Sequence, residues 1–119
     1  MKKINLREKF SLFDQYWTPK IVGELNGQYV KLAKVKGDCV WHKHESEDEL
    51  FMILRGSLTI ELEGEKIDLH EGEIFIVPKG VDHRPVAVEE AHILLFEPVS
   101  TAHTGDVDSE MTVKNQEWI

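Results

Sequence analysis

Two histidines separated by one residue form the part of this sequence best suited to chemistry. His42 and His44 lie in the stretch WHKHESEDE, residues 41–49, in which four acids follow the second histidine within five positions. Residues i and i+2 of a β-strand point to the same face, so both imidazoles can converge on one point, as metal binding requires. The alternative is a solvated charged turn in which the histidines have no joint role, and the stretch alone leaves both interpretations open.

Glu49 is the acid that we expect to join the two histidines. It lies an odd number of residues from each, so an unbroken strand would place it on the opposite face. The polar segment ESED, residues 45–48, is turn-like, and a bend there would return Glu49 to the inner face. A buried carboxylate is costly unless it is paired with a charge or a metal. Three acids of the bend are competing candidates, although solvent is their easier partner: Glu45, Glu47 and Asp48.

A second stretch, GEIFIVPKGVDH, ends at His83 and strengthens the metal hypothesis. The Pro-x-Gly sequence at residues 78–80 predicts a turn, because proline fixes φ and glycine permits a positive φ. His83 would then stand at the start of a new strand. If the sheet closes into a barrel, that strand can lie opposite His42 and His44.

The segments that must position these residues have the sequence pattern of short strands. Turn signals recur every eight to twelve residues, which favours an all-β sandwich or barrel. Asn26-Gly27 is a hairpin signal, since both central residues of such a turn must tolerate positive φ. Alternation of apolar and polar residues supports the same conclusion. The expected strands are KIVGEL, QYVKLAKV, LFMIL, LTIELE, KIDLH, IFIVP, HRPVAV and HILLFEPV, with a short turn or helix around Asn5 to Phe13.

Size and composition fit one domain, residues 1–119, with a barrel core of about 20–99 and a C-terminal tail at 100–119. The chain has 119 residues, 41% of them hydrophobic, and a net charge of -8. This negative charge argues against nucleic acid and anionic membranes as partners. The single cysteine, Cys39, excludes an intrachain disulfide, and the N-terminus lacks the apolar core of a signal peptide. We therefore expect a cytoplasmic protein.

Taken together, the two stretches resemble the motifs of the cupin superfamily, in particular its small single-domain members. The first motif, G-x5-H-x-H-x(3,4)-E-x6-G, corresponds to Gly37, His42, His44, Glu49 and Gly56, with the first spacer one residue short. The second motif is G-x5-P-x-G-x2-H-x3-N. It corresponds to Gly72, Pro78, Gly80 and His83, and Ala87 replaces the final asparagine.

The resemblance implies an antiparallel double-stranded β-helix, or jelly-roll barrel, that holds a three-histidine, one-glutamate metal site. The implied ligands are His42, His44, Glu49 and His83. Such a donor set suits a divalent transition metal, namely Fe, Mn, Ni, Cu or Zn. Four protein ligands on an octahedral ion leave two positions open for water, substrate or dioxygen. Small cupins commonly pair, so the resemblance also implies a homodimer.

Two functions fit these features. One is a metal-dependent enzyme that acts on a small organic molecule as a dioxygenase, decarboxylase, lyase or isomerase. The other is a non-catalytic cupin that binds or senses a small molecule or metal. Sugar-nucleotide epimerases of the superfamily generally lack the metal ligands, so the intact histidine pair argues against that branch.

The remaining reactive side chains have simpler expected roles. We expect His92 to be a core or edge residue, and Cys39 to pack on the face opposite the ligands. Tyr29 is a candidate acid or base if it faces inward. His103, in the tail, is either solvated or covers one mouth of the barrel. Trp118 is too apolar to lie free, so we expect it to pack on the barrel or on a partner subunit.

Overall fold

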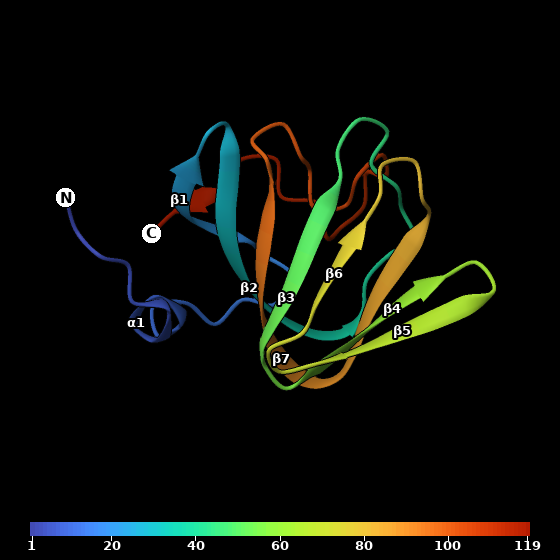
Figure 1. The fold of residues 1–119 in the computed structure, drawn as a ribbon, viewed down its shortest axis with the longest axis horizontal. Helices are drawn as coiled ribbons and strands as arrows, with labels where there is room; N and C mark the ends of the chain where they lie inside the picture. The colour runs from blue at the N-terminus through green and yellow to red at the C-terminus, as the bar shows by residue number, and fades with distance from the viewer.

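The computed structural model describes residues 1–119 and confirms the all-β fold, an antiparallel jelly-roll barrel. Figure 1 shows one short helix beside a curved set of strands, with the C-terminal tail returning to the edge of the sheet. The elements are α1 (Leu6–Phe10), β1 (Lys20–Leu25), β2 (Gln28–Asp38), β3 (Glu49–Arg55), β4 (Ser57–Leu62), β5 (Glu65–His70), β6 (Ile74–Val77), β7 (His83–Pro98) and β8 (Glu117–Trp118).

Helix α1 forms at the place predicted by the spacing of apolar residues. The Asn5 side chain accepts a hydrogen bond from the Glu8 backbone N–H, at 3.1 Å, and so caps the first turn. Phe10 and Phe13 are buried against Val22 and Leu32, outside the main core. The helix therefore packs on the middle of the β1–β2 hairpin and adds no residue to the main core.

Strand β7 is the central strand of the barrel, because it pairs with β2, β3 and β4. The sequence predicts two strands in this region, HRPVAV and HILLFEPV, but the structure has one continuous strand, His83–Pro98. The exposed residues 88–90 keep an extended conformation because β2 pairs with β7 on both sides of them, with a register shift between Val35 and Gly37. The opposite edge of β7 pairs first with β4 and then with β3. One long strand thus joins both halves of the jelly roll.

The core follows the predicted period of two. From Glu49 onward, alternate residues of β3 are buried, and Leu58 and Ile60 of β4 face the same interior. The buried core consists of Ala33, Val35, Phe51, Ile53, Leu58, Ile60, Leu69, Val77, Ala87, Ala91, Ile93 and Leu95. Glu49 stands at the end of this apolar stripe, and the bend at residues 45–48 places it there, as expected.

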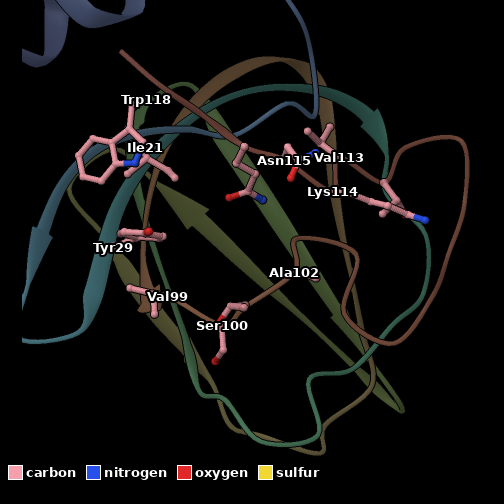
Figure 2. Close-up of a pocket in the computed structure, with 12 residues that line it drawn as sticks. Ile21, Tyr29, Val99, Ser100, Ala102, Val113, Lys114, Asn115 and Trp118 are labelled. Carbon is pink, nitrogen blue, oxygen red and sulfur yellow. The ribbon is translucent and has the colours of Figure 1, made fainter.

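The tail packs against the barrel as an irregular segment that ends in a strand. Strand β8 pairs in parallel with β1 at Lys20 and Ile21. The Trp118 ring meets Tyr29 edge-on, with centroids 5.6 Å apart, yet remains half-exposed. Figure 2 shows Tyr29, Trp118 and two stretches of the tail lining an open cleft of about 470 Å³. Tyr29 therefore faces this outer cleft.

None of the helices in the structure has the length and apolar character needed to cross a membrane.

Shortening a side chain at the centre of the barrel should destabilise the protein strongly. Ile53 is fully buried, whereas Ile76 is 51% exposed. We expect Ile53→Ala to lower the free energy of unfolding by about 2 to 5 kcal/mol. The matched change Ile76→Ala should cost less than about 1 kcal/mol, because it leaves no cavity. Chemical denaturation of both variants measures the difference, and equal losses would contradict this description of the core.

Candidate metal centre

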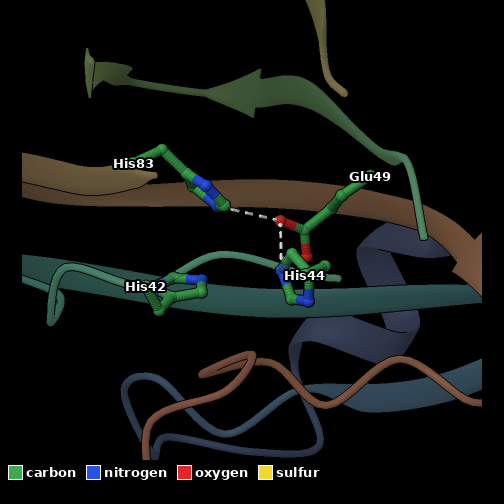
Figure 3. Close-up of side chains that lie close together, drawn as sticks. All are labelled: His42, His44, Glu49 and His83. Atoms are coloured by element: carbon green, nitrogen blue, oxygen red, sulfur yellow. Dashed lines mark ion pairs between the residues drawn. The ribbon is translucent and has the colours of Figure 1, made fainter. Parts of the chain in front are cut away.

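Four buried side chains converge at one end of the barrel interior. His42 and His44 come from the loop between β2 and β3, Glu49 begins β3, and His83 begins β7. Their ligand atoms all lie within 4.8 Å of one another. Figure 3 shows the imidazoles and the carboxylate pointing toward a common centre from three separate segments. The structure thus brings together the four residues that the sequence pattern singled out.

A pair of backbone hydrogen bonds sets the position of two of these histidines. The His42 N–H donates to the His83 carbonyl at 3.0 Å, and the His83 N–H donates to the His42 carbonyl at 2.8 Å. The expectation of a regular strand through His42 and His44 is wrong, since only His42 forms this isolated bridge. The His44 carbonyl instead accepts a hydrogen bond from Gly80 at 2.7 Å. Convergence therefore depends on pairing across the chain rather than on strand alternation.

The tautomers of two histidines are set by the backbone. Nδ1 of His42 lies 2.8 Å from the Val40 carbonyl, and Nδ1 of His83 lies 2.9 Å from the Val81 carbonyl. A carbonyl can only accept, so each Nδ1 carries the hydrogen and each Nε2 keeps its lone pair. Both Nε2 atoms are buried without a hydrogen-bond partner. They are oriented as neutral imidazole ligands require.

Glu49 supplies the negative charge of the cluster. Its Oε1 lies 3.3 Å from Nε2 of His44 and 3.4 Å from Nε2 of His83. Burial by itself would raise the pKa of Glu49, but its close contacts with the His44 and His83 rings outweigh burial and hold this pKa well below its ordinary value. For His42, burial and the neighbouring His83 lower the pKa to about 4. The cluster at neutral pH is therefore an ionised carboxylate among imidazoles, of which His42 is held neutral.

The competing acids of the bend point away from this centre. Glu45 pairs with Lys43 at 3.4 Å, and Glu47 accepts a hydrogen bond from Ser100 at 2.8 Å. Asp48 accepts one from the Lys79 backbone at 2.9 Å, which ties the bend to the turn before β7. These acids hold the loop in place rather than competing for the centre.

Two further buried charges, which the sequence analysis did not identify, stand behind Glu49. Lys31 and Glu97 are both fully buried and form an ion pair of 3.0 Å. Burial and the nearby Glu49 raise the pKa of Glu97 well above its ordinary value, although Lys31 opposes this shift. Glu49 is thus the more acidic of these two carboxyl groups. A signal was present in the sequence, because Lys31 and Glu97 share strand parity with the inward residues Val35 and Leu95.

A small cavity adjoins the cluster at two of its four residues, His42 and Glu49. It offers about 30 Å³ to water-sized molecules, enough for little more than a water or two. Its walls are mostly apolar, and His42, Glu49 and His103 also line it. Of the two expectations for His103, covering the barrel interior is therefore the one confirmed. The expectation that Cys39 packs on the opposite face is wrong: β2 ends at Asp38, so Cys39 leaves the strand alternation and lines this cavity.

The thiol of Cys39 and the ring of His92 contribute no reactive group to the centre. Burial raises the pKa of Cys39 to about 11, so it remains a neutral thiol. His92 stacks on Phe10, with centroids 4.6 Å apart, and pairs with Glu90 outside the barrel. His92 does not line the cavity, as expected, but it lies on β7, a strand that is paired on both sides and not at an edge of the sheet.

The C-terminal tail is fastened directly to the backbone between the two loop histidines. The Asp106 N–H donates to the Lys43 carbonyl at 3.1 Å, and an Asp106 carboxylate oxygen accepts from the Lys43 N–H at 3.2 Å. Gly105 lies so close that an added Cβ would collide with the Lys43 carbonyl and stand 2.9 Å from the His42 ring. Only glycine fits this contact. An outer cleft of about 250 Å³ separates the tail from residues 43–47 and reaches His44.

The donors present fit a divalent transition-metal ion. Three imidazole nitrogens and one carboxylate oxygen are ligands that Fe, Mn, Ni, Cu and Zn accept. One ligand atom of each of the four residues is buried without a hydrogen-bond partner, which is energetically costly. A single cation bound between the four residues would give each of these atoms a partner. The structure therefore supports a candidate site for one of these divalent ions.

Comparison with known proteins shows the family. The cupin domain profile matches residues 28–97, more than half of the chain, and the protein belongs to the cupin family. A cupin-2 domain containing protein from Shewanella frigidimarina is 45% identical, with a TM-score of 0.79 over 80% of this chain and 93% of that one. The structure of KdgF from Halomonas is 32% identical, with a TM-score of 0.59 over 67% of this chain and 78% of that one.

A curated relative carries the same name. The pectin degradation protein KdgF of Dickeya dadantii is 33% identical over 54 residues, which are 45% of this chain and 49% of that protein. The chain spans about half the length of the curated relatives that it matches.

The lowered pKa of His42 should make the metal-free protein sensitive to acid. His42 titrates near 4 when folded and near 6.5 when unfolded, so the unfolded chain takes up this proton first as the pH falls. The contribution of His42 to stability is complete above pH 6.5 and is lost between pH 6.5 and 4. The loss should be at most about 3 kcal/mol. The difference in unfolding free energy between wild type and His42→Gln should shrink accordingly, and a difference independent of pH would contradict the assignment.

Replacing Gly105 should loosen the tail. Gly105 and Gly64 both have positive φ, 57° and 80°, but only Gly105 lacks room for a Cβ. Each alanine variant should pay about 1 to 2 kcal/mol for the left-handed backbone. Gly105→Ala should lose at least about 1 kcal/mol more through collision with Lys43. Unfolding free energies and limited proteolysis of the tail measure this, and equal behaviour of the two variants would argue against the close contact.

Proposed function

We propose that His42, His44, Glu49 and His83 bind one divalent transition-metal ion, and that the protein is a metal-dependent enzyme acting on a small organic molecule. The observation that carries the proposal is the convergence of four buried donor atoms without hydrogen-bond partners. Protein interiors rarely leave such atoms unpaired. A cation at their centre gives each of them a partner.

The bound ion would supply Lewis acidity, polarising an oxygen atom of the substrate and stabilising the negative charge that develops there. The surrounding residues would orient the ligands, offset charge and limit access of water. Val40 and Val81 hold the imidazoles in their ligand tautomers, and Glu49 offsets part of the cationic charge. The apolar walls of the cavity limit water, which strengthens electrostatic interactions inside. A compact substrate with a polar end directed to the four residues fits this setting best.

The similarity to KdgF supports an enzymatic role over mere binding. The KdgF of Dickeya dadantii, 33% identical over the matched residues, is named a pectin degradation protein. The structure of KdgF from Halomonas, 32% identical, shares this fold. By analogy we infer a role on a small molecule derived from a carbohydrate, with lyase, isomerase, decarboxylase or dioxygenase chemistry. The second candidate is a non-catalytic binding module, which the small volume of the inner cavity favours.

Metal analysis tests the site itself. Protein purified without added metal and then loaded with one divalent ion should hold about one equivalent by elemental analysis. His42→Ala and His83→Ala should each lose most of it, since removal of one ligand of four weakens binding by orders of magnitude. His70→Ala, at the exposed end of β5, should retain it. Wild-type protein without metal, or ligand variants that hold as much as wild type, would overturn the site.

Turnover separates the enzyme from the binding module. Metal-loaded protein should convert at least one member of a panel of enolic, hydroxylated and carboxylate substrates, and Glu49→Gln should abolish that activity. Tight binding of panel members without conversion would favour the binding module instead.

A further inference from the structure

His103 is the polar residue of the cavity wall that the four-residue cluster does not include. It is 8% exposed, lies in the tail, and lines the same cavity as His42 and Glu49. His103 does not belong to the four residues whose metal-ligating atoms lie within 4.8 Å of one another. His103 therefore borders the space beside the cluster rather than completing the cluster.

The tail fixes the tautomer of His103. Its Nε2 lies 2.6 Å from the Met111 carbonyl, which can only accept a hydrogen bond. Nε2 consequently carries the hydrogen. In a neutral imidazole the other nitrogen, Nδ1, then presents a lone pair and acts as an acceptor. This Nδ1 is buried and has no hydrogen-bond partner.

Other cavity residues do not offer such an acceptor. The indole N–H of Trp17 is already donated to the Lys36 carbonyl at 2.8 Å. Cys39 is a neutral thiol, which is a weak hydrogen-bonding group. The rest of the wall outside the cluster is apolar. Outside the cluster, His103 is thus the one wall residue with a strong acceptor that is still without a partner, its Nδ1.

The position of His103 is well fixed. Its neighbour Thr104 is fully buried and donates from Oγ1 to the Val107 carbonyl at 2.8 Å. Gly105 and Asp106 are fastened to Lys43, between the two loop histidines. The ring is therefore held rigidly relative to the cluster, as a specificity-determining group must be.

We propose that His103 determines ligand specificity by accepting, at Nδ1, a hydrogen bond from a hydroxyl group of the ligand. The inference rests on the proposed function, since it places the ligand beside a metal ion. A hydroxyl is favoured over an ammonium group because a cationic donor would be repelled by the divalent ion nearby. The substrate class is then a small hydroxylated organic acid. Its carboxylate would lie toward the metal, and only its hydroxyl, about the size of a water, would enter the cavity beside His103.

Two substitutions separate the roles of the two ring nitrogens. His103→Gln can place an amide N–H near the position of Nε2 and so keep the bond to Met111, but it removes the acceptor at Nδ1. His103→Asn can place a carbonyl oxygen near the position of Nδ1 and so keep the acceptor, but it loses the bond to Met111. A purely structural role of His103 would be damaged more by the second change than by the first.

The binding test uses glycolate, which has a hydroxyl donor, and acetate, which lacks one. Titration calorimetry of the zinc-loaded proteins gives the ratio of the two dissociation constants. Any advantage from chelation of zinc by glycolate is common to all variants, so the change in the ratio reports on residue 103. We expect His103→Gln to reduce the preference for glycolate about tenfold, and His103→Asn to retain most of it.

A second measurement needs neither metal nor ligand. Nitrogen-15 chemical shifts of His103 in the metal-free wild type should show a protonated Nε2 and an unprotonated Nδ1. The reverse tautomer would overturn the inference whatever the variants do.

The outcomes distinguish this inference from the proposal on which it rests. Wild-type protein that takes up no zinc overturns the proposed function and the role of His103 together. Zinc-loaded His103→Gln that keeps the full preference for glycolate overturns the role of His103 alone. Zinc content that falls in His103→Gln would make His103 a ligand of the metal and also overturn it.

Discussion

The candidate site depends first on the reciprocal backbone hydrogen bonds between His42 and His83. These residues are far apart in the sequence, and neither His42 nor His44 belongs to a regular strand. The bridge closes this end of the barrel and at the same time sets two imidazoles side by side. Glu49 is then brought in by the bend of residues 45–48, which Asp48 ties to the turn before β7. One pairing interaction thus serves both the fold and the chemistry.

The sequence identified the four converging residues through their motif spacing, although the two loop histidines converge through long-range pairing and not through the expected strand alternation. Strand parity after the bend placed Glu49 correctly beside the apolar stripe, and the Pro-Lys-Gly turn placed His83 at the start of a strand. It failed where long-range pairing decides the outcome. Strand alternation misplaced Cys39, because the strand ends one residue before it, and β7 runs through the polar residues that had suggested a break. The burial of His103 depends on the path of the tail, which has no periodic pattern.

The barrel interior contains a buried lysine and a buried glutamate beyond the four residues of the candidate site. Lys31 and Glu97 lie behind Glu49, and Lys31 also donates to the Thr101 carbonyl at 3.3 Å. Buried ion pairs contribute little to stability once desolvation is counted, so stability alone does not account for them. Their arrangement links the carboxylate of the candidate site, through two strands, to the beginning of the tail. Lys31 and Glu97 therefore connect the candidate site electrostatically to the beginning of the tail.

The carbonyl contacts of His42 and His83 have a consequence for how the protein would acquire its metal. Their lone pairs are already aligned before any ion arrives, so the entropic cost of ordering these ligands is met during folding. This cost is the same for every ion, so ordering of the ligands does not discriminate among them. Intrinsic affinities would then follow the Irving–Williams order. We therefore expect the resident ion to be determined by which metals the cell makes available during protein synthesis, more than by the selectivity of the barrel.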